Sequence, residues 1–207
     1  MAPSRRTVWH GRMPVTALLV EGHSDRTALE ALARRRELDL ADAGVVVVAM
    51  GGITNLPAAL RQWAPADGGH RVVGLYDAPE GHVVRRGLER AGLIGPDHAD
   101  LTTVGFHGCV PDLEAELIRA LGAVRVEAIV AARGELRALR TLRTQPSWVD
   151  RPAEDQLRRF LGNAGRKARY APLLVDALDL RHVPAPLDRV LVDAVTPRGG
   201  RPPVRRP

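Results

Sequence analysis

Two apolar runs of this sequence, each predicted to be a strand, end on an acidic residue. Glu21 follows the run 17–20, and Asp77 follows the run 72–76. Because ligands of an open parallel sheet bind beyond the carboxyl ends of its strands, we expect both carboxylates at one edge of a sheet. Clustered carboxylate oxygens are hard ligands that select Mg²⁺ or Mn²⁺ over zinc. The pattern therefore predicts a divalent-cation site.

Four further acids stand at predicted strand ends or helix starts, namely Asp25, Glu80, Asp112 and Glu114. Asp25 shares a helix face with the apolar residues that follow it, which would turn its carboxylate towards the sheet edge. It could equally complement the helix N-terminus, with Ser24 as the N-cap, and Asp112 is also a good N-cap candidate. Taken together with the two strand-end acids, these four give a set of candidate metal ligands.

The elements that would position these acids alternate between strand and helix as far as residue 106. Strands are predicted at 17–20, 44–49 and 72–76 with a weaker one near 102–106, and helices after Glu21, at 53–63 and at 82–92. Four successive valines in 44–49 indicate a strand buried on both faces, which is typical of a parallel sheet. This alternation predicts an α/β fold with right-handed crossovers.

Beyond residue 106 the pattern becomes helical. Helices are predicted from Asp112 to Gly122 and at 124–132, 135–143, 154–161, 171–179 and 186–195. The expected organisation is a flexible basic N-terminus (1–14), an α/β core (15–108), a helical extension (109–195) and a disordered basic tail (196–207).

Charge and cysteine content limit the class of protein. The net charge is +6, but three arginines in residues 1–20 and four in 196–207, with no acid in either segment, leave the stretch between them nearly neutral. Basic ends of this kind can hold a polyanion non-specifically.

The single cysteine, Cys109, excludes internal disulfides, suits a reducing cytosol and is expected to be a buried apolar residue. With no membrane-length apolar run and no secretory signal, we expect a cytoplasmic protein.

The residues around the acids resemble those of the Toprim domain of primases, topoisomerases and several nucleases. The matching segments are Leu-Val-Glu21-Gly22-His-Ser-Asp25, Val-Ala-Met-Gly51-Gly52 and Gly-Leu-Tyr-Asp77. The later Asp112-Leu113-Glu114, a helical extension and a downstream Lys167 resemble the Toprim region of OLD-family (overcoming lysogenization defect) nucleases. The general resemblance covers about residues 15–106, and the OLD-like part extends it to about residue 180.

This resemblance implies a Toprim-like Rossmannoid sheet and a site that cuts phosphodiester bonds by two-metal-ion catalysis. Its metal-facing acids would be Glu21, Asp25, Asp77, Asp112 and Glu114, and the catalytic residues would be Glu21, Asp77 and Lys167, the lysine stabilising charge on the transferring phosphate. The usual Asp-x-Asp of Toprim is here Asp77-Ala78-Pro79-Glu80, so Glu80 is the expected sixth ligand.

The first hypothesis is therefore an Mg²⁺- or Mn²⁺-dependent nuclease, acting on DNA ahead of RNA. OLD proteins commonly carry an ATPase, and this sequence has no phosphate-cradling Gly-x-x-x-x-Gly-Lys-Ser/Thr motif, so a separate ATPase is an expected partner in trans. A second copy of the chain in a homodimer is another. Two alternatives stay open: a non-catalytic nucleic-acid-binding or adaptor module, and nucleotidyl transfer as in primases.

Overall fold

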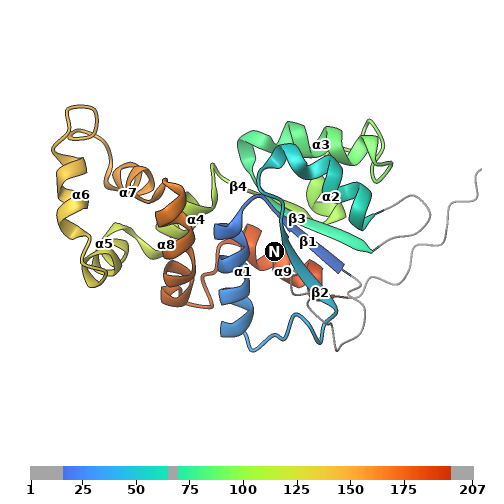
Figure 1. The fold of residues 1–207 in the computed structure, drawn as a ribbon, viewed down its shortest axis with the longest axis horizontal. Coiled ribbons are helices and arrows are strands. Elements are labelled where there is room, and N and C mark those ends of the chain that lie inside the picture. Colours follow the sequence, from blue (N-terminus) through green and yellow to red (C-terminus); the bar gives the residue numbers. More distant parts are fainter. Residues whose placement is uncertain (1–15, 65–69, 197–207) are drawn as a thin grey trace, which may run out of the picture.

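A four-stranded parallel sheet lies at the centre of the α/β part of the molecule (Figure 1). The computed structural model describes residues 16–64 and 70–196. The strands are β1 (Thr16–Val20), β2 (Val45–Ala49), β3 (Arg71–Asp77) and β4 (Phe106–Cys109), in the order β2-β1-β3-β4. Val20 pairs with both Ala49 and Leu75, and Asp77 pairs with Cys109. All four strands therefore end at the same edge of the sheet.

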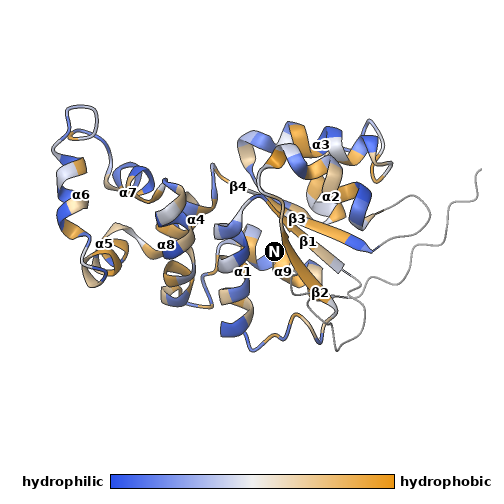
Figure 2. Cartoon of the chain, viewed as in Figure 1, coloured by the Kyte–Doolittle hydropathy of each residue, from blue (hydrophilic) through white to orange (hydrophobic). Residues whose placement is uncertain are grey.

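Strand position in the sheet decides how fully each strand is buried. All five residues of the inner strand β1 are buried, whereas β2 lies at the edge of the sheet. In β2, Val45 and Val47 are buried on one face, and Val46 and Val48 are only half-buried on the other. The expected burial of the valine run on both faces is therefore incomplete, because this strand has a neighbour on one side only. Figure 2 shows β2 as a strongly hydrophobic segment.

Helices cover both faces of the sheet, which confirms the predicted α/β class. One face, which carries Leu18, Val73 and Leu75, packs against α1 (His23–Arg35) and α9 (Ala185–Val195). The other face, which carries Leu19 and Val72, packs against α2 (Leu56–Trp63) and α3 (Gly81–Arg90). Short 3₁₀ turns lead into these helices at η1 (Ile53–Asn55) and η2 (Ala78–Glu80).

The fourth strand begins later than the sequence predicted. Residues Leu101–Val104 form the 3₁₀ turn η3, because the Asp100 carboxylate accepts a hydrogen bond from the Thr102 N–H at 2.9 Å. Gly105, at φ +84°, ends this turn, and β4 follows from Phe106. The β-branched residues of 102–104 suggested a strand, but the local cap of Asp100 holds them in a turn.

A group of helices follows β4 and packs on α1. These helices are α4 (Leu113–Leu121), α5 (Ala123–Ala132), α6 (Leu136–Arg143), α7 (Ala153–Leu161) and α8 (Ala164–Ala177). The longest of them, α8, lies against α1. The predicted helix at 171–179 was placed too late, because the Asn163 side chain caps α8 by accepting from the Arg166 N–H at 2.8 Å, and Pro172 lies inside the helix. Lys167 is thus on a helix near its N-terminal end.

After this helical part, the chain returns to the sheet. The last helix, α9, packs on β1, β3 and β4, so the segment 109–195 contains a helix that covers the α/β core. The expected basic N-terminus (1–14) and nearly all of the expected tail, 197–207, lie outside the described residues. No helix in 16–64 or 70–196 is both long and apolar enough to cross a membrane.

Candidate metal centre at the carboxyl edge of the sheet

The turns after β1 and β2 are hydrogen-bonded to each other. The Glu21 carbonyl oxygen accepts from the N–H groups of Gly51 and Gly52, at 2.9 and 3.0 Å. Gly51 and Gly52 have φ of +76° and +120°, a region that side chains with a Cβ rarely adopt. The double glycine therefore fixes the backbone of Glu21, the first of the predicted site residues.

Asp25 both caps α1 and faces the sheet edge. Its Oδ2 accepts from the Gly22 N–H at 2.8 Å, and Gly22, not Ser24 as predicted, is the N-cap of the helix. Burial raises the pKa of Asp25 to about 6, against the lowering effect of the Gly22 hydrogen bond. The negative charges of Glu114 and Glu21 raise this pKa further. Asp25 can therefore support the start of α1 and also belong to the acid cluster.

Asp77, the last residue of β3, is a further site acid with a raised pKa. Burial raises its pKa to about 7, and the charges of Asp25, Asp112 and Glu21 act in the same direction. Lys167 lowers it. Desolvation and nearby negative charges disfavour the ionised form of this carboxyl group, and a bound cation would stabilise that form.

Glu80 lies beside Glu21, although it comes one position later than the second acid of the usual Asp-x-Asp. Burial raises the pKa of Glu21, and a side-chain hydrogen bond to Glu80 and the charge of Glu80 raise it further. The Oε2 of Glu80 is buried and receives no hydrogen bond from the described residues.

The Asp-Leu-Glu segment at the start of α4 places two buried acids beside cations from distant helices. Asp112 caps α4 through the Ala115 N–H at 2.9 Å, and its other oxygen accepts from Arg158 on α7 at 2.6 Å. Glu114, only 4% exposed, accepts from the Lys167 Nζ on α8 at 2.9 Å. Both acids are therefore neutralised by a basic partner.

Lys167 stays protonated at neutral pH. Burial alone would lower its pKa, but the hydrogen bond to Glu114 and the charges of Asp77 and Asp112 outweigh that effect and raise the pKa above its ordinary value. Its ammonium group thus lies within electrostatic reach of acids from the ends of β3 and β4.

The predicted residues are brought to one edge, but not as a finished metal cage. The acids influence one another's pKa across the ends of three strands. As the side chains lie, no three His, Cys, Asp or Glu residues within 16–64 and 70–196 are grouped closely enough to hold an ion. The donor set nevertheless fits Mg²⁺ or Mn²⁺, because it consists of carboxylate oxygens and includes the buried, donor-free Oε2 of Glu80.

Sequence reasoning missed Arg158, which binds Asp112 from 46 residues away in the chain. No spacing rule could single it out among the many arginines of the sequence. Cys109 is buried, as expected, and burial and nearby acids raise the pKa of its thiol far above the ordinary value. Both effects disfavour the reactive thiolate, in keeping with the expected role of a buried apolar residue.

The first part of the sequence matches a known protein family. Residues 15–64, from β1 to α2, match the family model described as the Toprim domain of overcoming lysogenization defect (OLD) protein-like proteins. Over this segment the chain is similar to an OLD-like Toprim domain. The match includes Glu21 and Asp25, whereas Asp77 and the later acids of the site lie beyond it.

Solved structures extend the likeness over most of the chain. The C-terminal region of the Xanthomonas campestris pv. campestris OLD protein is 26% identical, with a TM-score of 0.65, covering 87% of this chain and 93% of that chain. The C-terminal region of the Burkholderia pseudomallei OLD protein shares the fold, at 20% identity and a TM-score of 0.63, covering 89% of this chain and 100% of that chain. No curated protein sequence matches the chain. The likeness to OLD proteins therefore extends well beyond residues 15–64, over most of the chain.

Proposed function

We propose that this OLD-like Toprim domain hydrolyses phosphodiester bonds of nucleic acid, with DNA as the expected substrate and Mg²⁺ or Mn²⁺ as the cofactor. The observation that carries the proposal is the acid cluster at the carboxyl edge of the sheet, in which burial and the neighbouring Glu80 raise the pKa of Glu21, and burial and neighbouring charges raise the pKa of Asp77 to about 7. A site that concentrates unbalanced negative charge in this way favours a bound cation.

Bound divalent cations would supply an activated water and stabilise the leaving oxygen of the phosphodiester. The chain's own part is to hold carboxylate oxygens at fixed places: Glu21 through the double-glycine turn, Asp77 through β3, and Asp25 through the first turn of α1. Lys167 contributes a permanent positive charge that can balance the charge of a transferring phosphate.

A cleavage assay tests this function. Purified protein is incubated with plasmid and with single-stranded DNA in Mn²⁺ or Mg²⁺, beside the variants Glu21→Gln and Asp77→Asn. We expect each variant to lose at least about a hundredfold in rate, the scale lost when one transition-state-stabilising group is removed. Lys167→Gln should lose activity on the same scale.

Matched controls are available on the other side of the sheet. Glu89→Gln lies on α3 and Asp97→Asn lies beyond the far end of that helix, and neither acts on the pKa of a site acid. Both controls should cleave like the unaltered protein. Cleavage that survives both Glu21→Gln and Asp77→Asn in folded protein would rule out this site.

A second candidate function is a nucleic-acid-binding adaptor without cleavage, working with a separate ATPase. It is favoured by the ion pairs Arg158–Asp112 and Lys167–Glu114, which neutralise two of the acids. In that case the protein would bind nucleic acid in both metal and EDTA, would show no cleavage with either cation, and Glu21→Gln would leave binding unchanged.

A further inference from the structure

A pocket of ≈ 490 Å³ opens beside the acidic edge, in the helical part of the molecule. It is lined by three residues of the candidate site and by residues of α7 and the turn before it. The lining residues are Asp112, Glu114, Trp148, Arg151, Asp155, Arg158, Arg159, Gly162 and Lys167. The pocket thus shares Asp112, Glu114 and Lys167 with the candidate metal centre, so a ligand in it would lie next to the reacting phosphate.

Two of the arginines in this pocket are free to bind an anion. Arg158 and Lys167 are engaged with Asp112 and Glu114. Arg151 and Arg159 are exposed, and within the described part of the chain neither forms an ion pair. Both line the pocket and place positive charge in it, as a phosphate-binding surface requires.

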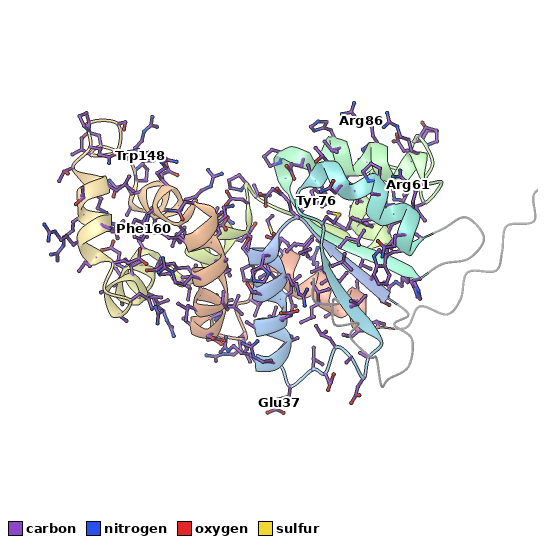
Figure 3. All side chains as sticks on the ribbon, viewed as in Figure 1. Glu37, Arg61, Tyr76, Arg86, Trp148 and Phe160 are labelled. Atoms are coloured by element: carbon purple, nitrogen blue, oxygen red, sulfur yellow. The ribbon has the colours of Figure 1, made fainter. Side chains whose placement is uncertain are left out.

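Trp148 gives the pocket an aromatic surface, and a buried side chain fixes the turn that carries it. It lies in the turn between α6 and α7 (Figure 3) and is half-buried. The buried Gln156 fixes this turn by donating from Nε2 to the Trp148 carbonyl oxygen at 2.7 Å. The Arg159 guanidinium is 5.9 Å from the centre of the indole ring, whereas Arg166 stacks on Phe160 at 3.9 Å. Arg159 is therefore only loosely associated with Trp148.

We propose that this pocket binds one unpaired nucleotide next to the scissile phosphate, with its base against Trp148 and its phosphate on Arg151 and Arg159. The substrate class is single-stranded nucleic acid, and this assignment rests on the proposed phosphodiester chemistry of the neighbouring edge. A base inside a duplex keeps both faces stacked on its neighbours, so only an unpaired base can lie against a tryptophan. The volume suits one small ligand of nucleotide size.

A second pocket adjoins the first on the side away from the acids of the candidate site. It has a volume of ≈ 670 Å³, lies between α6 and α7, and shares Arg159 and Gly162 with the first pocket. Arg137 on α6 lines it and is exposed, and within the described residues it forms no ion pair. A bound nucleic-acid strand would thus pass from the acidic edge over Arg159 towards α6.

The test measures binding separately from cleavage. Fluorescence anisotropy in EDTA, where no hydrolysis occurs, is recorded with a labelled oligothymidylate and with a duplex of the same length. We expect tighter binding of the single strand and a loss of about tenfold in Trp148→Ala, the scale of one base stacked on an aromatic side chain. Arg151→Gln should weaken single-strand binding and lower the salt slope of the binding constant by about 1.

Two matched controls complete the experiment. Arg86→Gln removes an exposed arginine on α3, at the other end of the molecule (Figure 3), and should leave binding unchanged. Trp148→Phe keeps an aromatic surface, so it should retain most of the affinity while losing the quenching of tryptophan fluorescence that the oligonucleotide causes. Such quenching would not depend on residue 148 if Trp148 were merely structural.

The outcomes separate the two proposals. If Trp148→Ala, folded by circular dichroism, binds the oligothymidylate like the unaltered protein, or weakens single strand and duplex equally, the nucleotide pocket is overturned. If binding depends on Trp148 and Arg151 but no cleavage occurs with either cation, the pocket stands and the nuclease proposal fails.

Discussion

At the scale of single residues, the acids of this site are held in environments that oppose their negative charge. Asp77 and Asp25 are desolvated and lie near other carboxylates, which raises their pKa values to about 7 and about 6. Both groups therefore bind protons more tightly in the folded protein than in the unfolded chain. Perturbed pKa values of this kind are typical of functional sites.

This arrangement predicts a stability that falls as the pH rises. Below the ordinary pKa of 3.8 both states are protonated and the full stability is present, and it is lost as the pH rises through the folded pKa of Asp77 at about 7. In EDTA, Asp77→Asn should be more stable than the unaltered protein at pH 8 by roughly 1–2 kcal/mol, after allowance for solvent screening, and equal to it near pH 4. Urea unfolding at both pH values measures the difference, and Asp97→Asn should show none. A difference that is the same at both pH values would contradict this explanation.

At the scale of elements, the site depends on where strands end and on which helices return to them. The strands β1, β3 and β4 deliver Glu21, Asp77 and the start of α4 to one edge. The last helix, α9, supports these strands from one face through Leu187, Val190 and Leu191, all buried. The carboxylate of Asp193 on the same helix accepts from His107 of β4 at 2.8 Å if that ring nitrogen carries the proton. The core therefore needs an element that follows the helical extension in the chain.

Removing α9 should unfold the α/β core rather than leave a shorter chain that is still folded. A chain ending at residue 184 loses three large buried side chains, each worth about 1.5–3 kcal/mol, against a total stability of about 5–15 kcal/mol for a typical domain. We expect loss of the cooperative thermal transition by circular dichroism. A chain ending at Thr196, which keeps α9 whole, is the control and should melt cooperatively. A cooperative transition in the shorter chain would show that the sheet does not need this helix.

At the scale of the whole molecule, two parts with different charge meet at the site. The sheet contributes acids, and the helical part contributes Arg158 and Lys167 together with the exposed Arg151 and Arg159. A cation on the acidic side and a phosphate on the arginine side would each relieve like-charge repulsion. Binding at this junction is therefore expected to stabilise both parts together.

Divalent cation should accordingly raise the melting temperature. At a Mn²⁺ concentration about 100 times its dissociation constant, the folded state gains about 2.7 kcal/mol, which corresponds to roughly 5–10 °C for a domain of this size. The shift should be smaller at pH 5, because protons compete for Asp77 and Asp25, and EDTA should reverse it. Differential scanning fluorimetry of the unaltered protein and Asp77→Asn measures the effect. A shift of equal size in Asp77→Asn would place the cation elsewhere.

The sequence by itself determined the elements that local patterns specify. Apolar runs ending on Glu21 and Asp77 predicted two strands and the edge where their carboxylates lie, because strand direction and side-chain period follow from the chain alone. The cap of Asp112 on α4 was equally local. The fourth strand and the start of α8 were misplaced, since the caps of Asp100 and Asn163 overrode the propensity of the residues that follow them.

Only the tertiary structure decided which distant groups meet. Lys167 and Glu114 are 53 residues apart, and Arg158 and Asp112 are 46 apart, so no spacing in the chain encodes these pairs. The return of α9 to the sheet and the turn that presents Trp148 beside the acids likewise depend on how helices pack. Helix packing is set by the fit of many side chains at once, whereas a strand or a cap is set by a few neighbours in the sequence.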